Sequence, residues 1–192
     1  KLDLSLRFLP RPADYLFLYL MGFYILLLSF RIDFRMAVLG ALAFGFSTYL
    51  IIIIGVGHNA KAHAIAYMPL VLSGILLTFQ KRYRLGFVLT TISVALELVA
   101  NHFQMTYYLL FVILFIGIAY AAKSFRNKEI PSFIKAALIL IAAAVLAVGM
   151  NATNLLATSE YAKQSTRSQS ELTVLADGGQ RPKTSGLDKD YI

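Results

Sequence analysis

The sequence predicts an all-α protein, a polytopic transmembrane helix bundle with about six spans. Hydrophobic residues occupy 58% of its 192 positions, and the mean hydropathy is +0.68, which is well above the usage of soluble domains. Six apolar runs are bounded by charged or polar residues and have roughly the length that a bilayer core of about 30 Å requires. They cover residues 13–30, 36–56, 64–79, 85–100, 105–122 and 134–151.

Short polar segments separate these runs in order along the chain. RIDFR (31–35) follows the first run, GHNAKAH (57–63) the second and QKRYR (80–84) the third. ANHFQ (100–104) follows the fourth, and a basic segment (123–135) follows the fifth. Small residues within the second run predict close helix packing; they are Gly40, Ala41, Ala43 and Gly45.

The third run contains Pro69 close to its start. Proline is tolerated in the first turn of a helix, where its missing N–H would lack a partner anyway. We therefore expect the helix to begin just before Pro69, with irregular backbone over residues 58–68. Because non-helical backbone at membrane depth is stable only against protein or a wet cavity, this expectation also predicts a cavity there.

The distribution of basic residues predicts the orientation in the membrane. The three segments 31–35, 80–84 and 123–135 hold nine Lys and Arg residues, whereas the alternate connections hold only Lys61. Because positive residues of short loops remain cytoplasmic, the basic loops are expected inside and the GHNAKAH and NHFQ segments outside. The net charge of +8 is thus explained by topology, and no nucleic-acid partner is expected because no basic stripe is interleaved with exposed aromatics.

We expect the sequence to be an internal fragment of a longer protein. It begins at Lys1 without an initiator methionine or signal peptide, which suggests an upstream helix and external loop. After residue 157 the composition changes to Ser, Thr, Gln, Gly and balanced charge. The predicted domains are a transmembrane domain (1–157) and an extracytoplasmic segment (158–192).

A first polar cluster, which we call the Lys61 cluster, consists of His58, Lys61 and His63. His58 and Lys61 are three residues apart and share a face of any helical turn. An ammonium group with imidazoles suits a phosphate or pyrophosphate, because lysine supplies a point charge and imidazole can donate or exchange protons. The alternative is that Lys61 merely extends toward the interface while the histidines lie in the headgroup layer.

A second polar cluster, the Glu97 cluster, consists of Glu97, Asn101, His102 and Gln104. Glu97 lies in the last turn of the fourth run, and Asn101 is one turn further on. The carboxylate could orient His102, accept a proton from a substrate hydroxyl or pair with Lys61; alternatively it is simply solvated at the interface.

Two other patterns are not expected to carry function. The three histidines and Glu97 lack the HExxH spacing that places two imidazoles on one helical face, so no metal site is predicted, although a divalent cation is left open as a cofactor. The sequon Asn151-Ala152-Thr153 lies against a predicted membrane end, and we interpret it as coincidental.

Several segments together resemble bacterial YfhO-family membrane proteins. They are LPRPADYLFLYLMGFYILLL, FRMAVLGALAFGFSTYL, GHNAKAHAIAYMPLVL, ANHFQMTYYLLF and NLLATSEYAKQSTR. His102-Phe103-Gln104 departs from the His-Pro-Gln expected in that family. The resemblance implies a branch of the C-type glycosyltransferase superfamily in the bacterial plasma membrane, with a polyprenyl-phosphate sugar donor, an envelope glycan or polymer acceptor and membrane lipid as partners. It also implies that the catalytic acidic residue lies upstream of Lys1, so that no residue of this chain is nominated for that role.

On this interpretation, Lys61 with His58 or His63 binds the donor phosphate and stabilises the leaving group. The Glu97 cluster orients the sugar or the acceptor, and Tyr107 and Tyr108 line the lipid tail or the sugar face. A transporter or flippase for a lipid-linked or envelope solute is the alternative function. A third hypothesis is a scaffold in which these residues only tie helices together.

Overall fold

The computed structural model describes residues 9–163, and the regular elements in that range are all α-helices. They fall into two compact units, one ending at Asn151 and the other beginning at Ala152. The first unit contains α1 (Ala13–Ser29), α2 (Phe34–Gly45), α3 (Thr48–Gly55), α4 (Asn59–Phe79), α5 (Tyr83–Ala100), α6 (Phe103–Arg126) and α7 (Ile130–Met150), and α8 (Ala152–Lys163) belongs to the second. Most of the predicted external segment, residues 164–192, lies outside the described residues.

The predicted all-α class is confirmed for the described part of the chain. There, α4, α5, α6 and α7 are each long and apolar enough to cross a membrane, and α2 with α3 would add a fifth crossing if the bent pair forms one span. α1 is apolar but has only 17 residues. The predicted count of six spans is therefore not confirmed.

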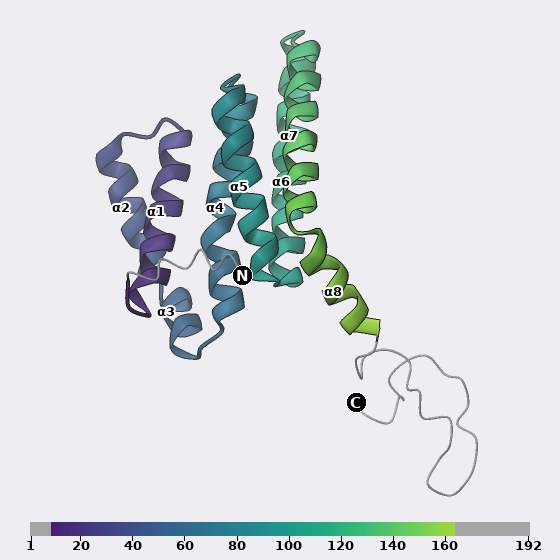
Figure 1. The fold of residues 1–192 in the computed structure, drawn as a ribbon. Coiled ribbons are helices and arrows are strands. Elements are labelled where there is room, and N and C mark those ends of the chain that lie inside the picture. The colour runs from purple at the N-terminus through teal and green to yellow at the C-terminus, as the bar shows by residue number, and fades with distance from the viewer. Residues whose placement is uncertain (1–8, 164–192) are drawn as a thin grey trace, which may run out of the picture. The chain divides into compact units, whose positions relative to one another are not determined.

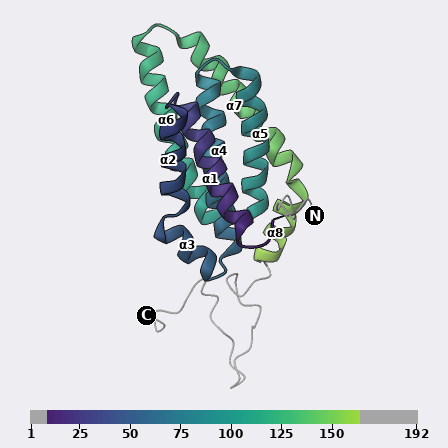
Figure 2. The same cartoon turned by 90° about the vertical axis from the view of Figure 1, so that its left-hand side faces the viewer.

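Consecutive long helices of the first unit run antiparallel, and α4 lies at its centre. α4 packs against α1 and α5, whereas α2 packs on α1 and α7 packs on α5 (Figures 1 and 2). In the most apolar stretch of α4, 67% of the residues are buried, against 11% in α6 and 17% in α7. α6 and α7 thus expose broad apolar faces, as lipid-facing helices do.

Residues 36–56, predicted as one span, do not form one continuous helix. α2 ends at Gly45, α3 begins at Thr48, and the two axes are bent by 46°. Ser47 precedes α3 with extended backbone, φ −61° and ψ 139°, a conformation that serine favours at helix starts. Hydropathy could not reveal the break because both sides are apolar. The close packing predicted for this run holds for Ala41 and Gly45, which are buried where α2 packs on α1, whereas Ala43 is exposed.

The expectation of irregular backbone before Pro69 is also wrong. α4 begins at Asn59 and continues as a helix through Pro69, which is buried. Pro69 has no N–H to donate to the Ile65 carbonyl oxygen, and such a proline is tolerated inside an apolar helix that packs against neighbouring helices. Ser73 Oγ donates to the Pro69 carbonyl oxygen at 2.8 Å, one turn further on. Because α4 is helical from Asn59 onward, irregular backbone gives no reason to expect a cavity before Pro69.

The closest helix contact joins α4 to α5 through glycines. A Cβ atom on Gly86 would lie 2.7 Å from the Thr78 amide nitrogen and 2.9 Å from the Gly74 carbonyl oxygen. A Cβ atom on Gly74 would lie 2.7 Å from the Thr90 amide nitrogen. Small residues permit such an approach, and van der Waals packing then stabilises the pair without any hydrophobic driving force between helices.

The basic loops gather at one end of the first unit, which we call the basic end. Three of their turns have a left-handed residue that ends a helix, namely Arg31 (φ 61°), Lys81 (φ 68°) and Lys128 (φ 57°). Each turn is closed by a backbone hydrogen bond of the kind that ends many helices. In the second turn, for example, the Arg82 N–H donates to the Leu77 carbonyl oxygen at 3.0 Å.

Contacts between chain segments fix this end as well. Gln80 Nε2 donates to the Ser29 carbonyl oxygen at 2.6 Å, and Lys81 Nζ donates to Glu129 Oε1 at 2.9 Å. This hydrogen bond and the charge of Glu129 raise the pKa of Lys81 above its usual value. The contribution that follows from the raised lysine pKa is therefore present at neutral pH and is lost as the pH rises through that pKa. It is small because both side chains are exposed.

Candidate functional site

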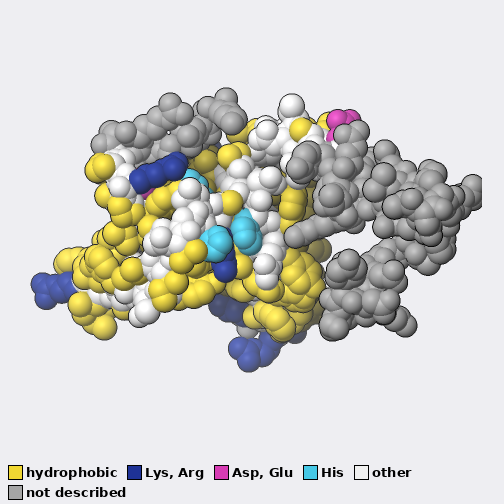
Figure 3. Space-filling model, turned by 90° about the horizontal axis from the view of Figure 1, so that it is seen from below, with side chains coloured by type: hydrophobic (Ala, Val, Ile, Leu, Met, Phe, Trp, Pro, Cys, Tyr) yellow, Lys and Arg dark blue, Asp and Glu magenta, His cyan; other side chains and the backbone are white. Residues whose placement is uncertain are grey.

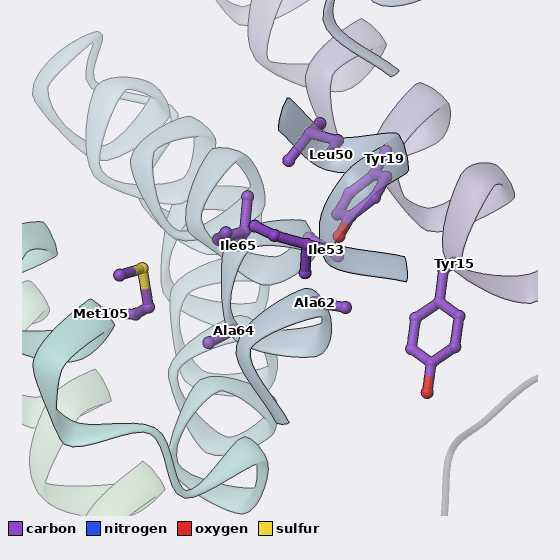
Figure 4. Packing of buried hydrophobic residues seen from close by; sticks show 9 residues of the cluster. Tyr15, Tyr19, Leu50, Ile53, Ala62, Ala64, Ile65 and Met105 are labelled. Atoms are coloured by element: carbon purple, nitrogen blue, oxygen red, sulfur yellow. The ribbon is translucent and has the colours of Figure 1, made fainter. Parts of the chain in front are cut away.

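The Lys61 and Glu97 clusters lie at the same end of the first unit, opposite the basic end. α4 begins there, α5 ends there and α6 begins there (Figures 1 and 2). One hydrophobic cluster at this end includes Tyr15 of α1, Ala64 of α4 and Met105 of α6, with Ala100 of α5 packed against it (Figure 4). The two polar clusters are therefore neighbours on one packed surface, which we call the polar end.

His58 and Lys61 lie at the surface of the polar end. His58 is exposed and immediately precedes α4. Lys61 is half-buried, and its Nζ lies 5.3 Å from the centroid of the Tyr49 ring on α3, within the range of a cation–π interaction. Viewed from this end, histidine side chains reach the surface beside a basic side chain (Figure 3). An anion approaching from outside would thus meet an imidazole and an ammonium group.

His63 occupies a different environment from its two neighbours in the cluster. Its ring centroid lies 4.7 Å from that of Tyr15 on α1 and 6.0 Å from that of Tyr67, with which it is stacked. Tyr15 and Tyr67 are both buried. His63 is therefore part of the packed α1–α4 interface, whereas His58 and Lys61 are the accessible members of the cluster.

Glu97 is buried, with only 1% of its surface exposed, so the alternative of a solvated carboxylate is wrong. Oε1 accepts a hydrogen bond from Thr106 Oγ1 at 3.2 Å, and Oε2 has no hydrogen-bond partner within residues 9–163. Among the described residues Glu97 forms no ion pair, so the suggested pairing with Lys61 does not occur. A buried carboxyl group without a cation is costly, which marks this position as unusual for a purely structural residue.

The remaining members of the Glu97 cluster lie in the turn between α5 and α6 and in the first turn of α6. Asn101 is exposed and left-handed (φ 53°), and His102 Nδ1 accepts the Met105 N–H at 3.4 Å as an N-cap of α6. Gln104 Nε2 donates to the Tyr108 hydroxyl at 2.9 Å. The suggested orientation of His102 by Glu97 does not occur, since the carboxylate bonds to Thr106 instead.

Tyr107 and Tyr108 extend the polar end along α6. They are 56% and 48% exposed, so both rings are accessible. Tyr107 packs edge-on against Phe111 with ring centroids 4.7 Å apart. They form an exposed aromatic strip next to the Glu97 cluster, on a helix whose other exposed residues are mostly apolar.

The α4–α5 contact relates the levels of the two clusters along the bundle. Gly74 faces Thr90 across this contact. Tyr67 precedes Gly74 by seven residues and Glu97 follows Thr90 by seven, which is about two turns in each antiparallel helix. Tyr67 and Glu97 therefore lie at a similar level of the α4–α5 pair.

Asp14, which was not predicted as a site residue, is a second buried acid at the polar end. It lies in the first turn of α1 and is 2% exposed. Its Oδ1 accepts the Tyr15 N–H at 2.9 Å, and its Oδ2 lies 3.9 Å from Arg11 Nε. The available signal was an acid inside the first apolar run, since ionisable residues within apolar segments are functional candidates.

Asn151 fastens the end of α7 to α5. Its side chain is 4% exposed, and Nδ2 donates to the Ala95 carbonyl at 3.1 Å and to the Ala147 carbonyl at 3.0 Å. A nitrogen buried in this way is not available for glycosylation in the folded protein. This agrees with the interpretation of the sequon as coincidental.

We expect Asn151→Ala to reduce the free energy of unfolding by about 1–3 kcal/mol, because it leaves a buried carbonyl without its partner. Thr153→Ala is the matched control: it also removes the sequon, but Thr153 is exposed. Denaturation in detergent micelles would measure both. Equal effects of the two substitutions would contradict the assigned role of Asn151.

Within residues 9–163 no group of three or more His, Cys, Asp or Glu side chains is arranged to hold a metal ion. No protein-family model, no curated protein and no solved structure matches the chain.

Proposed function

We propose that this protein is a membrane glycosyltransferase-like enzyme of the YfhO type, which transfers a sugar from a polyprenyl-phosphate donor to a cell-envelope acceptor. The observation that supports it is the gathering of accessible His58 and Lys61 and buried Glu97 at one end of the bundle, opposite the basic loops. If the basic loops face the cytoplasm of a bacterial plasma membrane, the polar end faces the extracytoplasmic side.

Lys61 and His58 would bind the donor phosphate. In the transfer, an acceptor hydroxyl oxygen bonds to the anomeric carbon while the bond from that carbon to the phosphate oxygen breaks. Polyprenyl phosphate then leaves with an additional negative charge, and positioned cationic or N–H donors stabilise this charge. The acceptor proton passes to a general base, a role that we assign to no residue of this chain.

The sugar and acceptor would lie over the α5–α6 turn. Asn101 and Gln104 are exposed there and can form hydrogen bonds with sugar hydroxyls. Tyr107 and Tyr108 provide exposed aromatic faces beside them, suited to a sugar ring or to the prenyl chain. The position at the end of apolar α6 would let the lipid part of the donor remain in the bilayer while its phosphate reaches Lys61.

Lys61→Ala and His58→Ala are each expected to lower sugar transfer in membranes by about 100-fold, the usual cost of losing one donor to a developing anion. Lys128→Ala removes the same charge at the basic end and should leave turnover unchanged. Transfer would be measured with a radiolabelled polyprenyl-phosphate sugar and normalised to folded protein. Unchanged turnover in both polar-end variants would remove the phosphate role.

One observation favours the alternative of a transporter or flippase. Glu97 is buried within a helix that can cross a membrane, and one of its oxygens has no partner in the part of the chain that the structure describes. Intramembrane carboxyl groups often belong to proton or substrate pathways. A transporter would move its solute across sealed vesicles without forming a glycosidic product, and Glu97→Gln would abolish this flux.

A further inference from the structure

A shallow, wide-open hollow of about 530 Å³ lies along the first half of α7, at the basic end, and is lined by residues of this one helix. Its lining is apolar except for one lysine; the residues are Pro131, Ile134, Lys135, Leu138, Ile139 and Ala142. These positions recur every three or four residues and form one stripe of the helix. A hollow this open does not enclose a soluble ligand, so an occupant would have one side against the helix and the other toward the surrounding bilayer.

The length of the hollow matches one leaflet of a bilayer. Pro131 and Ala142 are separated by eleven residues, which in an α-helix span about 16 Å. Half of a hydrocarbon core of about 30 Å is about 15 Å. The hollow starts at the basic end and therefore extends through the depth that one acyl chain occupies.

The charged and hydroxyl groups lie at the end of the hollow where a lipid headgroup would be. Lys135 is exposed, and its Nζ lies 4.7 Å from the centroid of the Tyr83 ring. The Tyr83 hydroxyl is 3.3 Å from Ser132 Oγ, one turn before Lys135. The neighbouring acid, Glu129, forms an ion pair with Lys81. The mouth of the hollow thus has an available ammonium group and two hydroxyls.

We propose that this hollow binds one anionic phospholipid of the leaflet at the basic end. Lys135 binds the phosphate, with Ser132 and Tyr83 supplying hydroxyl contacts, and one acyl chain lies along the apolar stripe as far as Ala142. Arg82 and Arg84 flank Tyr83 in the sequence and are exposed, which adds positive potential at the same level. Anionic headgroups of a cytoplasmic leaflet are attracted to such basic segments. This site does not depend on the proposed sugar transfer.

The test is lipid retention by the full chain, measured by native mass spectrometry after extraction from vesicles of equal phosphatidylglycerol and phosphatidylcholine. The wild type should retain phosphatidylglycerol preferentially. Lys135→Gln should lower this preference about fivefold, the effect of one lysine near an anionic surface, and Lys135→Arg should keep it. Leu138→Trp, which fills the hollow, should lower retention without changing the charge.

Lys128→Gln is the matched control, because Lys128 is exposed at the basic end but does not line the hollow. Its preference should equal that of the wild type. An equal loss in Lys128→Gln and Lys135→Gln would show diffuse attraction and overturn the proposal. Equal retention of the two lipids by the wild type would exclude a headgroup site, and unchanged retention in Leu138→Trp would exclude an acyl chain in the hollow.

Discussion

Gly86→Ala is expected to destabilise the folded protein by about 3 kcal/mol, the upper part of the usual range for overpacking. The added Cβ atom would lie 2.7 Å from the Thr78 amide nitrogen and 2.9 Å from the Gly74 carbonyl oxygen. Both are backbone atoms, so α4 and α5 must move apart to accept the methyl group. Because α4 is the central helix, this separation should affect the whole first unit. Unfolding in mixed micelles would measure the loss.

Gly117→Ala is the control for this prediction. Gly117 lies within α6, and a Cβ atom there would meet nothing within 4 Å. The substitution should change stability by less than about 1 kcal/mol, with any gain coming from helix propensity. Similar losses in both variants would mean that the α4–α5 contact does not depend on the absence of a side chain at Gly86.

Glu97→Gln is expected to keep the fold and to lower the proposed sugar transfer by about 100-fold, the cost of misplacing a bound substrate that the carboxylate would orient. The glutamine carbonyl can still accept the hydrogen bond that Glu97 Oε1 now receives from Thr106. The substitution removes the charge and replaces Oε2, which has no hydrogen-bond partner among the described residues, with an amide nitrogen. Activity per folded molecule, with folded yield from size-exclusion chromatography, separates function from stability.

Asp33→Asn makes the same chemical change at the basic end. Asp33 is exposed and caps α2 by accepting the Arg35 N–H at 2.9 Å, a role that asparagine fills equally well. Transfer should be unchanged in this variant. If Glu97→Gln instead lowers the folded yield while specific activity stays intact, the scaffold hypothesis is correct and the functional one is wrong.

Hydropathy and charge predicted most helices to within a few residues. The run 85–100 became α5 (Tyr83–Ala100), and the run 105–122 became α6 (Phe103–Arg126). The errors arose where composition carries no information about packing. Ser47 interrupts a stretch that is apolar on both sides, and Pro69 lies in a helix stabilised by its neighbours. Local rules predicted a break at the proline and none at the serine.

The numbers of Lys and Arg residues in alternate loops were sufficient to predict that both clusters lie at the same end of the bundle. It could not predict the partners of their residues. Lys61 lies over Tyr49 because the bend before α3 brings that ring to the polar end, and the bend itself was not foreseen. Glu97 bonds to Thr106 rather than to Lys61 because the α5–α6 turn returns the chain beside it.

We propose that the two polar clusters lie at one face of the membrane and that the basic loops lie at the other face. Single cysteines test it directly, because the sequence contains none. In intact cells a membrane-impermeant maleimide should label His58→Cys and Gln104→Cys, and should label Lys128→Cys only after permeabilisation. Labelling of His58→Cys and Gln104→Cys from opposite sides of the membrane would contradict the account.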